Sequence, residues 1–201
     1  MQLLANFNRH GLHKELMKLD FKHRIAFAAA CCERLLPHYI AFTRETSWGD
    51  AQKLADILDM IWKHIEEKEI TKKELQKLSS DCEKIIPDAD AFTGVLKDYA
   101  QDTSIAVCLV LDYLLTNNTD SLVYVAEHAV DTVDLYVQES ENMDSNDPKL
   151  EDKILRHPLM QKELAKQSDD LNLLAKSELL TTELLHKLRL SSKESNIGLS
   201  I

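Results

Sequence analysis

The stretch from Asp102 to Leu115, DTSIAVCLVLDYLL, carries apolar residues on most sides of a helix. Successive residues of an α-helix are 100° apart, so these side chains cover more than half of its circumference. One strip remains polar, and it holds Gln101, Asp102 and Asp112. A helix of this kind needs neighbours on several sides. We therefore predict that it is the central helix of a bundle.

Apolar residues recur at helical spacing along most of the remaining chain. They predict an amphipathic segment within residues 1–19 and a longer helix at about residues 21–45. Pro37 lies inside the longer helix, where it has no N–H to donate, so we expect a kink or a break there. Additional helices are expected at about residues 51–67, 72–85, 120–139, 149–156 and 158–190.

Two of these helices have clear start signals. Gly49 followed by Asp50 fits a left-handed residue after one helix and an N-cap for the next. Thr71 and Glu74 have the spacing of a capping box, in which each side chain accepts a hydrogen bond from the other residue's backbone.

The pattern as a whole predicts one all-α domain over residues 1–201, with about seven or eight helices around the central apolar helix. No alternating pattern is long enough to indicate a β-strand. Residues 191–201, SSKESNIGLSI, lack the helical period and are expected to form a non-helical C-terminal tail.

Charge narrows the range of partners. The chain has 34 acidic and 24 basic residues, a formal net charge of −10. Nucleic acids and anionic membranes bind through cationic surfaces, so neither is an expected partner. No apolar run approaches the roughly 18 residues of a membrane span, and the first residues lack the features of a secretory signal. The four cysteines are expected to be free thiols, which favours a cytoplasmic location.

The sequence pattern gives little support for a metal site or a cofactor site. A di-metal helical bundle needs a Glu-x-x-His pair on each of two helices, and this chain has one such pair, Glu183 and His186. Other acidic and histidine residues are better explained as a solvated helix face or as isolated surface groups. They are Glu127, His128, Asp131 and Asp134 on one helix, and His10 and His13 near the start. We expect neither a metal nor a cofactor, and we assign no catalytic residue.

The Pro37 region is the best candidate for a small-ligand site. A kinked helix frees a carbonyl group and can direct neighbouring polar side chains into a cavity. The expected ligand contacts are Glu33, Arg34, Tyr39 and Asp102. The simpler alternative is that Glu33 and Arg34 form structural salt bridges and that Asp102 is exposed or has a structural role.

The last predicted helix carries leucine on more sides than one bundle contact requires. These residues are Leu164, Leu171, Leu173, Leu174, Leu179, Leu180, Leu184 and Leu185. We therefore favour a non-enzymatic protein-interaction or self-associating module, with a possible homodimer formed through this face. The alternative is a small-ligand or metal-binding helical protein, which can be an enzyme, with its polar site near Pro37.

Several sequence blocks resemble a known bacterial family, the YjaG-like proteins with domain of unknown function 416. The blocks are CERLLPHY at 32–39, WGD at 48–50, EKIIPDADAF at 83–92, EHAV at 127–130 and ESNIG at 194–198. The resemblance runs nearly from end to end. It implies an all-helical, cytoplasmic protein, and it supplies no catalytic residue because no activity is established for the family.

Overall fold

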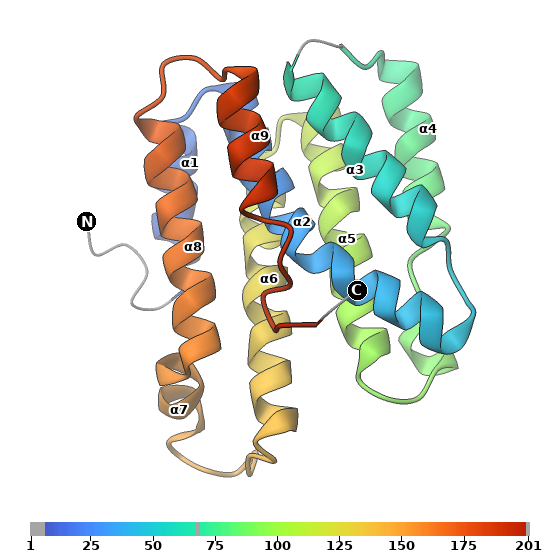
Figure 1. Cartoon of the computed structure of the whole chain (residues 1–201), viewed down its shortest axis with the longest axis vertical. Helices are drawn as coiled ribbons and strands as arrows, with labels where there is room; N and C mark the ends of the chain where they lie inside the picture. The colour runs from blue at the N-terminus through green and yellow to red at the C-terminus, as the bar shows by residue number, and fades with distance from the viewer. Residues whose placement is uncertain (1–6, 67–68, 200–201) are drawn as a thin grey trace.

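The computed structural model describes residues 7–66 and 69–199 (Figure 1). Within this part the chain forms nine α-helices and one short 3-10 helix. They are α1 (Arg9–Met17), α2 (Phe21–Thr46), α3 (Ala51–Glu66), α4 (Lys72–Glu83), η1 (Ala89–Ala91), α5 (Leu96–Thr116), α6 (Thr119–Ser140), α7 (Leu150–Arg156), α8 (Pro158–Ala175) and α9 (Thr182–Leu190). The all-α fold predicted from the sequence is confirmed. Residue 67, the predicted end of the third helix, lies outside the described residues.

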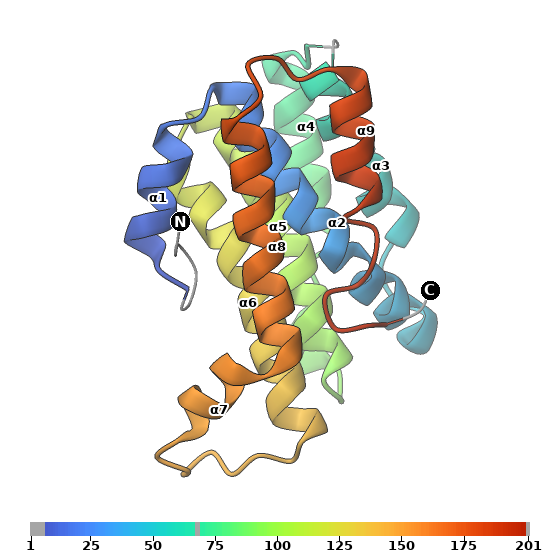
Figure 2. The same cartoon turned by 60° about the vertical axis from the view of Figure 1, so that its left-hand side comes forward.

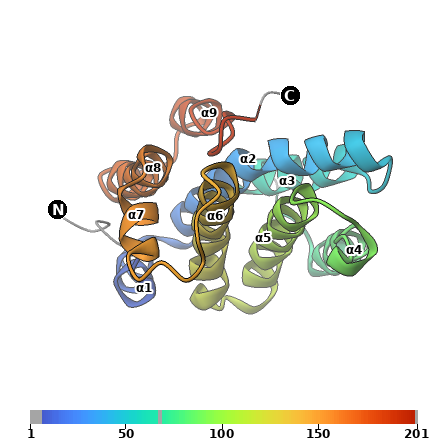
Figure 3. The same ribbon diagram turned by 90° about the horizontal axis from the view of Figure 1, so that it is seen from below.

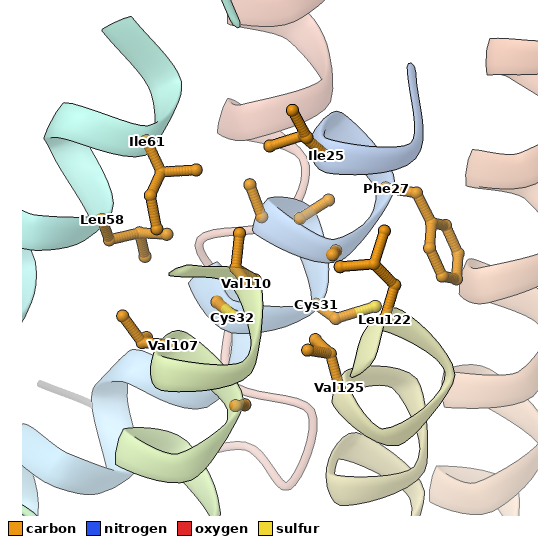
Figure 4. Packing of buried hydrophobic residues seen from close by; sticks show 14 of the residues in the cluster. Ile25, Phe27, Cys31, Cys32, Leu58, Ile61, Val107, Val110, Leu122 and Val125 are labelled. Carbon is orange, nitrogen blue, oxygen red and sulfur yellow. The ribbon is translucent and has the colours of Figure 1, made fainter. Parts of the chain in front are cut away.

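Helix α2 is the most thoroughly buried element of the bundle. Sixteen of its 26 residues are buried, and it packs against α3, α5, α6, α8 and α9. The small side chains Ala28, Ala29 and Ala30 on α2 are fully buried, which allows neighbouring helices to approach closely. Figure 4 shows its apolar side chains between those of α3 and α5 on one side and those of α6 on the other. The predicted central helix is α5, which lies inside the bundle between α2, α4 and α6.

Helix α2 continues through Pro37 as one helix, so the proline does not break it. It is also the one helix, among the described residues, that is long and apolar enough to cross a membrane. However, 83% of its most apolar 18-residue window is buried inside the protein. This burial explains why an apolar helix of this length is stable here: its neighbours remove its surface from water.

Both predicted helix starts are confirmed. The carboxylate of Asp50 accepts a hydrogen bond from the backbone N–H of Lys53 at 2.9 Å, at the start of α3. Thr71 and Glu74 form the expected capping box at the start of α4. Gly49 has a φ of +88°, and the hydroxyl of Tyr39 lies so close that a Cβ at this position would meet it at 2.6 Å. Position 49 therefore requires glycine for two independent reasons.

The single long C-terminal helix expected over residues 158–190 is wrong. The chain leaves α8 at Lys176, turns through a loop, and starts α9 with Thr181 as N-cap, whose hydroxyl accepts from the N–H of Leu184. The two helices form a hairpin against α2 (Figures 1 and 2). Thr181 was the local signal for this break, because threonine favours the N-cap over a helix interior.

The break also changes where the leucines lie. Leu164, Leu171, Leu174 and Leu185 are buried within the bundle, and Leu173, Leu180 and Leu184 are partly buried. Leu179 alone of the eight is exposed, at 77%. The extended leucine face predicted as an interaction surface is therefore used inside the molecule.

The described part of the tail, residues 191–199, has no helix and contains turns and irregular backbone. It leaves α9 and crosses α2 and α6 (Figures 1 and 3). Ile197 lies in a second apolar cluster together with Tyr99 of α5, Val133 of α6 and Met160 of α8. The tail is thus part of the packed structure, and residues 200–201 lie outside the described part.

We predict that Phe27→Ala lowers the free energy of unfolding by about 3–5 kcal/mol, because it leaves a cavity at a fully buried position. Leu190→Ala, at a position that is 59% exposed, is the control and is expected to change it by less than about 0.5 kcal/mol. Equilibrium denaturation in urea measures both values. Equal effects of the two substitutions would contradict the core assigned to α2.

Candidate functional site

The four residues predicted to form a ligand site, Glu33, Arg34, Tyr39 and Asp102, do not converge on one cavity. Each has its own partners on a different part of the bundle. Tyr39 donates to the carbonyl of Ile85 at 2.6 Å, and burial raises the pKa of its hydroxyl to about 12. It therefore acts as a neutral structural link between α2 and the end of α4.

Glu33 and Arg34 are neighbours on α2, but their side chains point about 100° apart because of the helical turn. Glu33 is buried, and its Oε1 accepts from the indole N–H of Trp62 at 2.9 Å and from Nε of Arg189 at 2.5 Å. Arg189 also binds Asp59 and lies over the Trp62 ring, 5.7 Å from its centroid. Glu33 thus links α2 to α3 and α9.

Arg34 is buried on the other side of α2 and binds α8. Its Nε and one terminal nitrogen donate to the two oxygens of Glu163 at 3.0 and 2.8 Å. The other terminal nitrogen donates to Asp170 at 3.2 Å and to the carbonyl of Ala30 at 3.0 Å. A further contact reaches the sulfur of Cys31. The five N–H groups of the guanidinium are matched by five acceptors, so no donor remains for a ligand.

Burial and charge act in opposite directions on this buried cluster. Burial alone would lower the pKa of Arg34, but the carboxylates of Glu163 and Asp170 outweigh it and raise the pKa above the ordinary value. Burial raises the pKa of Asp170, and Arg34 and Lys166 oppose that shift. Lys166 donates to both Asp170 and Ser192, and Gln167 donates to Glu163 and to the carbonyl of Ala126. The network joins α2, α6 and α8 to the first residues of the tail.

A cleft of about 270 Å³ lies between α8 and the tail, beside this network. Its lining includes the buried pair Arg34 and Glu163, the lysines of α8 and part of the tail. The charges are mixed, because Lys162 and Lys166 are balanced by Asp169 and Glu194. Arg34 therefore lines a cleft, as predicted for a ligand-site residue. However, every N–H group of its guanidinium already has an acceptor within the protein.

Three consecutive tail residues are held by specific contacts. Ser195 Oγ lies 2.9 Å from Nε2 of His38 and also accepts from the N–H of Ile197. The Asn196 amide donates to the carbonyl of Ala129 on α6 at 2.8 Å. Ile197 enters the second apolar cluster. These contacts fix an irregular segment on the bundle without any help from secondary structure.

The His38–Ser195 pair has the distance of a base and a nucleophile, but its electrostatics do not suit catalysis. Burial lowers the pKa of His38 to about 3, which makes the imidazole a poor proton acceptor at neutral pH. Its Nδ1 also has no partner among the described residues, so no third group orients the ring. The pair is best explained as an anchor of the tail.

Asp102 forms a separate, partly exposed group with α6. Its two carboxylate oxygens contact Nδ1 of His128 at 2.8 Å and the hydroxyl of Thr132 at 3.2 Å. Glu127, on the same stripe, is paired with Arg9 of α1 at 2.5 Å. Among the residues that the structure describes, no three His, Cys, Asp or Glu side chains are grouped in a way that could hold a metal ion.

The sequence analysis missed the partners of Glu33 and Arg34, namely Arg189, Glu163 and Asp170, and it missed the anchor formed by His38 and Ser195. The first three lie on helix faces whose local charge pattern is ordinary. Ser195 and Asn196 did carry a signal, because they lie in the ESNIG block of the family resemblance.

These features define an all-helical protein whose buried polar groups join its C-terminal hairpin and tail to one long core helix. The chain belongs to the DUF416 family, described as "Protein of unknown function (DUF416)", whose profile matches residues 11–200. The family resemblance found in the sequence is therefore confirmed.

Individual relatives agree with this assignment. The chain is 29% identical over 195 residues to "Uncharacterized protein YjaG" of Escherichia coli (strain K12), covering 95% of this chain and 97% of the relative. It is 25% identical over 149 residues to an uncharacterized protein of Haemophilus influenzae, covering 72% of this chain and 74% of that protein. The crystal structure of a DUF416 family protein from Shewanella baltica OS155 is similar, with a TM-score of 0.85 and 25% identity. That comparison covers 94% of this chain and 98% of the other, and none of these relatives indicates a specific function.

We predict that Arg34→Ala lowers the free energy of unfolding by about 3–5 kcal/mol, because it leaves the buried carboxylate of Glu163 without its cation and leaves Asp170 with Lys166 alone. The control is Lys153→Ala, which removes the partner of Asp147 in an exposed pair and is expected to cost less than about 1 kcal/mol. Urea denaturation compares the two variants. A loss below about 1 kcal/mol for Arg34→Ala would show that the network is dispensable.

We predict that His38 makes the protein less stable in acid. In the unfolded chain this residue takes up a proton near its ordinary pKa of 6.5, whereas in the folded protein its pKa is about 3. The unfolding free energy therefore falls below pH 6.5, by up to about 1.4 kcal/mol per pH unit from this residue.

The matched variant for this prediction is His38→Gln, which keeps a hydrogen-bonding group near Ser195 and does not titrate. Denaturation of both proteins between pH 7 and pH 4 isolates the contribution of His38 as a difference. The comparison is needed because buried carboxyl groups such as Glu33, whose pKa is raised by burial, increase the unfolding free energy as the pH falls and so oppose the effect of His38. Parallel curves for the two proteins would disprove the prediction.

Proposed function

We propose that the protein is a non-enzymatic interaction module that associates with a second copy of itself, and that it works in the cytoplasm. The observation that carries this proposal is a pair of complementary apolar features at one end of the bundle. The α1–α2 loop, the α8–α9 loop and the end of α3 meet at this end (Figure 2).

The first feature is a hollow of about 510 Å³, and the second is a projecting side chain beside it. Phe21, Ile65 and Leu180 contribute apolar groups to the hollow. Leu179 lines the same hollow and is 77% exposed. A projection and a recess on one surface are what a two-fold symmetric contact requires, because each copy can insert its Leu179 into the recess of the other.

The loop that presents Leu179 is held in place. The ring of His23 lies 2.8 Å from the carbonyl of Ser177, which ties the α8–α9 loop to the first turn of α2. Phe21 is stacked on Tyr113 at a centroid distance of 5.2 Å. Held groups lose little conformational freedom on binding, which favours association. Around them lie three carboxylates, Asp20, Glu66 and Glu178, and one lysine, so Lys22 of each copy can pair with a carboxylate of the other.

Four free cysteines, three of them buried, support a reducing compartment and hence the cytoplasmic part of the proposal. The alternative of a small-ligand protein with a site near Pro37 is supported by the cleft beside Arg34. We rank it second because Glu33, Arg34, Tyr39 and Asp102 face different partners.

We predict that the untagged protein forms a homodimer and that Leu179→Ser weakens it about 100-fold. The substitution removes two leucines from the symmetric interface, one from each copy. Burial of each leucine contributes about 1.5 kcal/mol or more to the free energy of association. Native mass spectrometry and sedimentation equilibrium over a range of concentrations measure the dissociation constant. The same mass spectrum detects a bound small molecule, which would favour the alternative.

Leu190→Ser is the matched control, since Leu190 is also exposed but lies at the other end of α9. It is expected to dimerise like the wild type. A wild-type chain that stays monomeric at all concentrations tested, or equal weakening by the two serine variants, would refute the proposal.

A further inference from the structure

The contact between the tail and the bundle has the chemistry of peptide recognition. Residues 191–199 contain no helix, yet Ser195, Asn196 and Ile197 are each at most 5% exposed. Three successive side chains make three different kinds of contact: a hydroxyl with an imidazole, an amide with a backbone carbonyl, and an aliphatic group with an apolar cluster. Peptide segments are recognised through side chains of this kind, each placed in its own pocket or against its own partner.

We infer that the surface beneath the tail, formed by His38, Ala129 and the second apolar cluster, is a peptide-binding site that the chain's own tail fills. We call it the tail seat. Its ligand is a short segment that turns as residues 195–198 do, where the N–H of Gly198 donates to the carbonyl of Ser195 at 3.2 Å. It carries a hydroxyl, a carboxamide and an aliphatic side chain in successive positions. An acidic residue before the hydroxyl also fits, since Glu194 lies 3.8 Å from Lys162 on the rim.

The tail does not saturate the tail seat. Nδ1 of His38, in the tail seat, and Oδ1 of Asn196, in the tail itself, are buried without a hydrogen-bond partner among the described residues. The hydroxyl of Tyr99 is also buried without a hydrogen-bond partner among these residues, and its ring centroid lies 5.9 Å from that of His38. Buried polar groups normally find partners, so these atoms mark an imperfect fit. A partner segment that supplies the missing donors and acceptors competes with the tail.

The cleft described above gives such a segment a point of entry. Ser191, Glu194, Ser195 and Asn196 form its tail side, and α8 forms the opposite side. The tail can therefore be approached along one edge without separating α8 from α2. This site lies on the face crossed by the tail, away from the end of the bundle proposed for self-association.

The test uses the full-length chain with Ile197→Asp, which places a charge in the apolar cluster and releases the tail. The probe is a fluorescein-labelled peptide with the sequence of residues 193–199, KESNIGL, followed by fluorescence anisotropy. We expect it to bind the variant at least about tenfold more tightly than the wild type, whose tail seat is occupied. The same peptide carrying N196D or I197D is expected to bind at least about tenfold more weakly.

Failure of a folded Ile197→Asp variant to bind the peptide, or equal binding of the altered peptides, would overturn the inference. Should this variant not fold, hydrogen exchange on the wild-type chain decides. If the tail opens without the rest of the bundle, the backbone amides of residues 194–198 exchange at least about tenfold faster than those in the cores of α2 and α8. Exchange at the rate of those helices would show that the tail opens only with the whole bundle, which would also overturn it.

Discussion

The ionic contact of Arg34 with Glu163 and Asp170 is the constraint on which the C-terminal third of the fold depends. A guanidinium in the protein interior loses its hydration, and a buried charge without a partner is strongly destabilising. Arg34 is buried, so water relieves little of this cost. Helix α8 must therefore lie where both of its carboxylates reach α2, and this requirement fixes the position of the α8–α9 hairpin and of the tail that follows it.

Glu33 imposes the same kind of requirement on a different side of α2. Because it precedes Arg34 by one residue of the helix, its carboxylate faces α3 and α9, where Trp62 and Arg189 satisfy it. Two adjacent residues of one helix thus place two separate helices. Buried ion pairs of this kind contribute little net stability compared with apolar packing, but they penalise every alternative arrangement that leaves a charge unpaired. Their role here is to select one packing of the C-terminal hairpin.

The sequence predicted what depends on neighbours within one or two turns. Helical periodicity identified the bundle, and the signals at Asp50 and Thr71 located two helix starts. The break before α9 was missed because the leucine pattern continues across it, while the N-cap signal at Thr181 was outweighed. The separation of Glu33 from Arg34 follows from the helical turn, but their partners lie 156 and 129 residues away. No local pattern encodes which distant carboxylate or guanidinium completes such a pair, so the candidate site near Pro37 could be proposed but not resolved into its contacts.

The separation between Arg34 and Glu163 has a consequence for synthesis of the protein. The 129 residues between them take roughly 10 seconds to translate at about 5–20 residues per second. During that interval α2 can form and begin to pack against α3, α5 and α6, while its most buried cation still lacks both carboxylates. The early helices must therefore leave the α8 side of α2 open to water until late in translation. Folding of this chain on the ribosome is expected to proceed through a state in which one side of its core helix remains hydrated.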